Sequence, residues 1–90
     1  MDKKVLIWMD PNISDEENEY YQKMLKVCIP ESYFFDNVDN GIEQLKLIYF
    51  KDTVIILSCQ FYDNFYTKLI ENIFTAFQKF IYLLLKVINT

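Results

Sequence analysis

The stretch "DTVIILSCQFYDNFY", residues 52–66, decides the fold class of this chain. Its first part, Thr53 to Leu57, is an apolar and largely β-branched run, which is typical of a strand buried on both faces. Asp63 or Asn64 can then cap a helix, because their side-chain oxygens accept hydrogen bonds from the free N–H groups of a first turn. A buried strand followed closely by a helix is the repeating unit of parallel α/β sheets.

A first strand and helix are predicted near the start of the chain. The run "KVLIWM", Lys4 to Met9, is continuously apolar after its lysine and, like Thr53 to Leu57, predicts a strand that is buried on both faces. A helix is expected to follow, with Ser14 and Glu17 at the spacing of a capping box. Pro30 ends that helix, because proline has no N–H and clashes with the preceding turn. The residues expected to share its inward face are Tyr21, Met24, Leu25 and Cys28.

The middle of the chain predicts another strand and another helix. Ser32 to Asn37 forms a short strand, and the helix "DNGIEQLKLIYF" follows with Asn40 as its expected cap. The inward face of that helix is expected to carry Ile42, Leu45, Ile48 and Tyr49. The inward face of the third helix, after Asp63, is expected to carry Phe65, Leu69, Ile73, Ala76 and Phe77.

The last apolar run, Phe80 to Ile88, is predicted as a fourth strand because every residue from Phe80 to Leu85 is apolar; the alternative is a continued third helix. The whole chain, residues 1–90, is thus expected to be a single α/β domain with the element order βαβαβαβ, a parallel sheet and helices on both faces. Thr53 to Leu57 is expected to be the central strand.

The composition excludes several function classes. The chain has nine lysines, no arginine, no histidine and a net charge of −4. The acidic charge and the lack of arginine disfavour nucleic-acid binding, and the lack of histidine disfavours acid/base catalysis. Cys28 and Cys59 without histidine give no zinc set, and we expect no cofactor. The opening residues lack the apolar core of a signal peptide, so reduced thiols and a cytoplasmic location are expected. The alternative is a disulfide between Cys28 and Cys59. The segment 73–88 is apolar but carries Gln78, Lys79 and Lys86, which disfavours a membrane span.

Two segments carry a resemblance to a known group of proteins. "NVDNGIEQLK" resembles the segment of response-regulator receivers in which a small turn with glycine opens the second helix. Leu57, Ser58 and Phe61, with Tyr66 further on, resemble the strand end of TIR domains. The resemblance implies a flavodoxin-like fold truncated to about four strands, because the family usually has five. It also implies a signalling module, of the kind found ahead of effectors such as ADP-ribosyltransferases.

The same resemblance supplies the candidate site residues and their departures. Ser58 or Leu57 stands where receivers carry a phosphorylated aspartate, and the acidic pair after the first strand is reduced to Asp10 with Asn12 nearby. One carboxylate is too few for a magnesium pocket. Glu71 lies near the position of the catalytic glutamate of NAD-cleaving TIR domains.

A ligand or interaction edge is expected at the carboxyl ends of the strands, where open α/β sheets bind ligands. Its candidate residues are Asp10, Asn12, Ser58 and Cys59. The alternatives are structural. Asp10 suits a turn in "DPN", and Cys59 has no histidine to activate it and suits a small buried thiol. Glu71 can be a solvent-facing acid that pairs with Lys68.

The sequence therefore favours a non-catalytic signalling or interaction module. Its partner is expected to be another protein or a second copy, engaged through the strand Phe80 to Ile88, because an exposed apolar edge strand pairs readily. One alternative is a TIR-like NAD-cleaving enzyme that uses Glu71. Another is a small membrane-associated protein anchored through residues 73–88.

Overall fold

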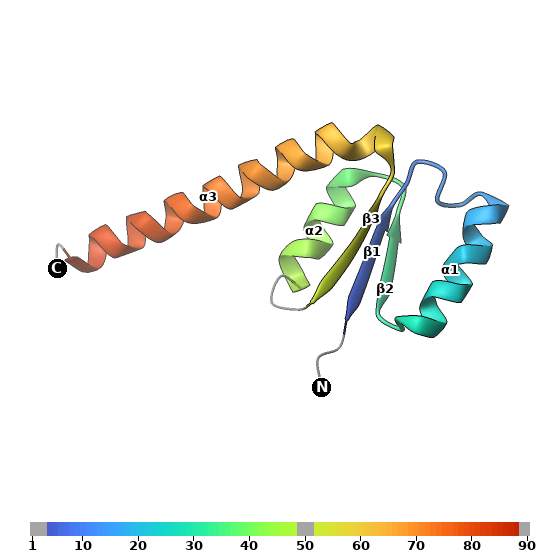
Figure 1. The fold of residues 1–90 in the computed structure, drawn as a ribbon. Coiled ribbons are helices and arrows are strands. Elements are labelled where there is room, and N and C mark those ends of the chain that lie inside the picture. The colour runs from blue at the N-terminus through green and yellow to red at the C-terminus, as the bar shows by residue number, and fades with distance from the viewer. Residues whose placement is uncertain (1–3, 49–51, 89–90) are drawn as a thin grey trace.

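A computed structural model of the chain describes residues 4–48 and 52–88 (Figure 1). Over these residues the chain is an α/β protein with three parallel strands and three α-helices. In chain order the elements are β1 (Val5–Met9), α1 (Glu16–Cys28), β2 (Ser32–Phe35), α2 (Val38–Ile48), β3 (Thr53–Leu57), the short 3₁₀ helix η1 (Cys59–Phe61) and α3 (Tyr62–Ile88). The predicted strands at Lys4 to Met9, Ser32 to Asn37 and Thr53 to Leu57 are therefore confirmed within two residues at each end.

The central strand is β1, not β3. The sheet order is β2-β1-β3, and β1 pairs in parallel with both neighbours, Leu6 opposite Ser32 and Val54. All five residues of β1 are buried, whereas Val54, Ile55 and Ile56 are each 38% exposed. The expectation that Thr53 to Leu57 is central is thus wrong. A continuously apolar strand is also compatible with an edge position, and hydropathy alone does not separate the two.

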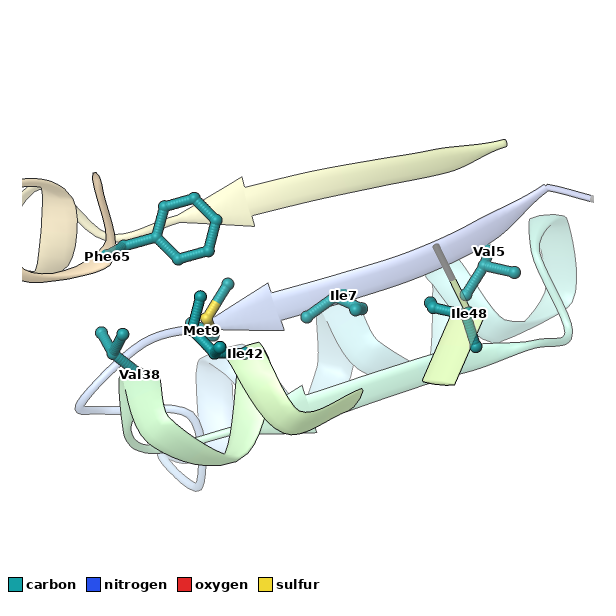
Figure 2. Packing of buried hydrophobic residues seen from close by; sticks show 7 residues of the cluster. All are labelled: Val5, Ile7, Met9, Val38, Ile42, Ile48 and Phe65. Carbon is teal, nitrogen blue, oxygen red and sulfur yellow. The ribbon is translucent and has the colours of Figure 1, made fainter. Parts of the chain in front are cut away.

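The main core lies between the sheet and α2. Val5, Ile7 and Met9 alternate along β1 and point to one face, where they meet Ile42 of α2 and Phe65 of α3 (Figure 2). Val38 and Ile48 of α2 complete the buried cluster. Of the predicted inward face of α2, Ile42 and Ile48 are buried and Leu45 packs against the cluster, while Tyr49 lies outside the described residues.

Helix α1 lies on the other face of the sheet and packs more loosely. It begins at Glu16 with Asp15 as N-cap, and the Asp15 side chain makes no capping hydrogen bond. The predicted capping box of Ser14 and Glu17 is therefore wrong, because the N-cap is Asp15 and Ser14 lies one residue before it. Asn18 Nδ2 instead donates to the Asn12 carbonyl oxygen (2.7 Å) and ties the helix to the preceding turn. None of the residues 16–28 is buried.

Helix α2 is capped one turn earlier than predicted. The Asn37 side-chain oxygen accepts a hydrogen bond from the Asn40 N–H (2.9 Å), so Asn37 and not Asn40 caps the helix. The helix carries the single glycine of the chain, Gly41, on its buried side.

The segment Phe80 to Ile88 is the end of α3, a helix of 27 residues, and not a fourth strand. No glycine or proline interrupts the chain after Tyr62, and a continuous apolar run can belong to either structure. The predicted inward face of this helix holds only for its first turns, since Phe65 is buried and Leu69 packs on the core. Ile73 and Ala76 are exposed, and the side chain of Phe77 lies outside what the structure describes.

Helix α3 leaves the body of the domain and gives the chain an elongated shape (Figure 1). The principal extents are 57 × 33 × 14 Å, and the radius of gyration is 16.4 Å. A compact domain of this length would have a radius of gyration of about 12 Å. In the described part of the chain, no helix combines the length and apolar character needed to cross a membrane.

Candidate functional site

The carboxyl ends of the three strands are tied together by backbone hydrogen bonds. The Asp10 N–H donates to the Phe35 carbonyl oxygen (3.0 Å), which joins the ends of β1 and β2. The Ser58 N–H donates to the Met9 carbonyl oxygen (2.9 Å), which joins the ends of β1 and β3. Asp10 and Ser58 therefore lie next to one another at the carboxyl edge of the sheet, as the sequence predicts.

The Asp10 carboxylate is used by its own turn. Its Oδ1 accepts a hydrogen bond from the Asn12 N–H (2.8 Å), and its carbonyl oxygen accepts one from the Ile13 N–H (3.1 Å). This is the side-chain-to-backbone bonding by which aspartate stabilises tight turns. The turn alternative for Asp10 and Asn12 thus has a direct structural basis.

Ser58 and Cys59 begin the short helix η1. Ser58 Oγ accepts a hydrogen bond from the Gln60 N–H (3.4 Å), so this hydroxyl caps the turn. Cys59 is exposed and free, which corrects the alternative of a small buried thiol. The correction has a simple cause: β3 is an edge strand, so the residues that follow it also lie at the surface. Among residues 4–48 and 52–88, no three His, Cys, Asp or Glu side chains are grouped closely enough to hold a metal ion.

Glu71 lies away from this edge. It is exposed and sits nine residues into α3, about 14 Å along the helix from its start. Lys68 is expected to pair with it but instead forms an ion pair with Asp39 at the start of α2. The structure therefore does not bring Glu71 together with Asp10, Asn12, Ser58 or Cys59.

Strand β3 exposes an apolar surface at the edge of the sheet. The middle residues of β3, Val54, Ile55 and Ile56, are exposed, and among the described strands only β1 pairs with β3. We call these three residues the open edge. Such an edge offers unpaired backbone groups beside apolar side chains, and Thr53 to Leu57 contains no charge, proline or glycine that would protect it.

Helix α3 exposes a second apolar surface. Among the side chains that the structure describes after Leu69, its exposed large apolar residues are Ile70 (49%), Ile73 (61%), Phe74 (60%) and Ile81 (38%). At about 100° per residue these four positions fall within one arc of about 100°, so they form a single face, which we call the α3 stripe.

A groove between α1 and the sheet is the third apolar surface. A cavity of about 340 Å³ opens there, and its lining is almost entirely apolar. The lining residues, which we call the α1 groove, are Trp8, Tyr21, Met24, Leu25, Cys28 and Ile56. The predicted inward face of α1 is thus correct in direction, since all four of its residues face the sheet, but Tyr21 and Met24 remain about half exposed.

The chain exposes more surface than a compact protein of its mass, because α3 projects from the rest of the fold. The accessible surface is 7068 Å² for a mass of 10.9 kDa. A compact monomer of that mass exposes about 5,600 Å², so the excess is about 1,500 Å². Sequence reasoning missed this surface because it assigned the last apolar run to the sheet. The sequence signal was the absence of any glycine or proline after Tyr62, which allows one long helix.

Comparison with known protein families, with curated proteins and with solved structures finds no match to this chain.

Proposed function

We propose that the chain is a non-catalytic interaction module of the receiver-like or TIR-like type, which binds a protein partner through its exposed apolar surface. The observation that carries this proposal is the combination of the open edge and the α3 stripe, with three and four exposed apolar residues. Exposed apolar patches on a protein surface often mark contact sites for other proteins. The surface replaces the strand Phe80 to Ile88 as the expected contact, since that segment is helical.

The strand order supports the receiver-like or TIR-like part of the proposal. The order β2-β1-β3 with parallel pairing corresponds to the first three strands of the doubly wound order 2-1-3-4-5. In that order a further strand would pair with β3. The open edge is therefore the position at which this type of sheet is normally extended.

The chemistry of the carboxyl edge supports the non-catalytic part. The Asp10 carboxylate and the Ser58 hydroxyl both accept hydrogen bonds from nearby backbone N–H groups, so both stabilise the local turns in which they lie. Cys59 is exposed, and a cysteine nucleophile needs a neighbouring base or cation to form its thiolate. The chain contains no histidine to act as that base.

Site-directed photo-crosslinking tests this function. A photoreactive phenylalanine analogue is placed at Phe74 in the α3 stripe, at Ile55 in the open edge and, as a matched control, at exposed Glu43 on α2. In cells expressing the chain, discrete protein adducts at positions 74 and 55 but not 43 are expected. The absence of any adduct, to another protein or to the chain itself, would reject the proposal. Recovery of the chain with vesicles in a flotation assay would favour the membrane-associated alternative instead.

A further inference from the structure

We propose that the partner is a second copy of this chain: the α3 stripe of each copy docks into the α1 groove and against the open edge of the other. This inference rests on the proposed function and names its partner. The arrangement is a reciprocal exchange of helices about a two-fold axis, in which each chain contributes both contact surfaces.

Helix α3 cannot fill the groove of its own chain. Phe65 packs in the core on the α2 face of the sheet, and Lys68 pairs with Asp39 of α2, so the start of α3 is fixed on that face. The α1 groove opens on the opposite face, beside Trp8 and α1. Because residues 62–88 form one uninterrupted helix without glycine or proline, α3 has no hinge at which to turn around the sheet. Figure 1 shows α3 running away from α1.

The two surfaces match in chemistry. The α1 groove is an open surface lined by apolar side chains of α1 and the sheet. The α3 stripe is an exposed apolar face of a helix. An amphipathic helix laid into an apolar groove is anchored by residues at the spacing i, i+3, i+4 and beyond. Ile70, Ile73 and Phe74 have this spacing, and Ile81 continues it.

The exposed area fits a dimer of this chain. The excess of about 1,500 Å² per chain sets an upper bound of about 3,000 Å² on the area that two copies can bury, which is more than the roughly 1,200 Å² that a specific interface needs. Pairing of the two α3 helices with each other would cover the stripes alone. Reciprocal docking covers the stripe, the groove and the open edge together, so it accounts for more of the excess.

Disulfide trapping between two differently marked chains tests the arrangement. One chain keeps Cys28 in the groove and carries Cys59→Ser. The other carries Cys28→Ser and Cys59→Ser with one new thiol beside the stripe, from Glu71→Cys or Gln78→Cys. Under mild oxidation we expect a mixed dimer bridged from Cys28 to position 71 or 78, identified by peptide mass spectrometry. The matched control, Glu43→Cys on α2, is expected to give no bridge to Cys28.

The oligomeric state in solution is an independent test, because it does not depend on how the introduced thiols are placed. Light scattering after size-exclusion chromatography is expected to give twice the chain mass of 10.9 kDa. Phe74→Lys is expected to weaken the dimer at least tenfold without loss of the helical circular dichroism signal, because Phe74 is exposed within its own chain.

Several results would overturn the inference. These are a monomer at all concentrations, bridges only between two position-78 thiols, or a bridge from Cys28 to position 78 within one chain carrying both. A monomer whose positions 74 and 55 still crosslink to another protein would overturn the homodimer alone and leave the proposed function standing. A monomer with no adduct at either position would reject both.

Discussion

Gly41 of α2 lies directly against the Met9 side chain of β1: a Cβ at position 41 would lie 2.7 Å from Met9 Cγ. Met9 is fully buried, so the helix backbone approaches the central strand as closely as the methionine allows. The backbone of Gly41 does not have a positive φ. The glycine is therefore needed for space and not for an unusual conformation.

We expect Gly41→Ala to destabilise the domain. Overpacking against Met9 costs about 1–3 kcal/mol, and the better helix propensity of alanine returns about 1 kcal/mol at most. Urea unfolding followed by circular dichroism measures the difference. In a Met9→Ala background the same change is expected to be neutral or stabilising, because the clashing atoms are gone. Asn40→Ala, an exposed neighbour, is the control and should change the free energy of unfolding by about 0.5 kcal/mol or less. Equal destabilisation in both backgrounds would refute the close contact.

Aspartate substitutions distinguish the central strand from the edge strand. Ile7 in β1 is 0% exposed, so Ile7→Asp places an unpaired charge in the core and is expected to unfold the domain. Ile56→Asp would have the same effect if β3 were central. Because Ile56 is 38% exposed on an edge strand, we expect this variant to keep a cooperative melt at a lower temperature. A native-like melt for Ile7→Asp would contradict the observed strand order.

Residues 52–66 show how far the sequence determines this fold. The apolar run Thr53 to Leu57 correctly predicts β3 to the residue, because its flanks are polar and its side chains are β-branched or leucine. It does not reveal that β3 is an edge strand, because strand order depends on which neighbours are present. The run Phe80 to Ile88 is ambiguous for a different reason: an apolar segment without alternation or breakers has no period that favours strand or helix.

The candidate site shows the same limit. Sequence position correctly places Asp10 and Ser58 at one edge, because parallel strands end together. It does not predict that the Asp10 carboxylate bonds to the Asn12 N–H, since that depends on turn geometry. The sequence also does not predict the α1 groove. The spacing of Tyr21 and Met24 shows which face of α1 is turned to the sheet, but not how closely that face packs.

The ion pair between Lys68 and Asp39 is expected to make a small, salt-sensitive contribution to holding α3 on α2. The Asp39 side chain is 71% exposed, and ion pairs of this kind stabilise by about 1 kcal/mol or less. A double-mutant cycle with Lys68→Met and Asp39→Asn, measured by urea unfolding, gives the coupling energy. It should fall towards zero near 1 M salt, where the Debye length is about 3 Å. The exposed pair Lys46–Glu43, within α2, is the comparison and should couple less strongly. A coupling energy that is unchanged by salt would contradict a solvent-exposed pair.

We expect the chain not to cleave NAD. Glu71 is exposed on the projecting part of α3 and is not brought to the carboxyl edge of the sheet. Purified protein incubated with NAD should release no more nicotinamide than a buffer blank, and Glu71→Ala should behave identically. Nicotinamide release that disappears in Glu71→Ala, but persists in the control Glu43→Ala, would establish the enzymatic alternative.

The two free thiols report on the docking of α3 without any engineered probe. Cys59 begins η1 and Cys28 lines the α1 groove, and both are exposed in the single chain. Both should therefore react with a thiol reagent in the native protein at low concentration. As the concentration rises and the groove fills, we expect Cys28 to be labelled at least several-fold more slowly while Cys59 is unaffected. Phe74→Lys should remove the concentration dependence, because it weakens the docking of the partner's α3 over Cys28. Labelling of Cys28 that stays as fast as that of Cys59 at every concentration would show that nothing docks in the groove.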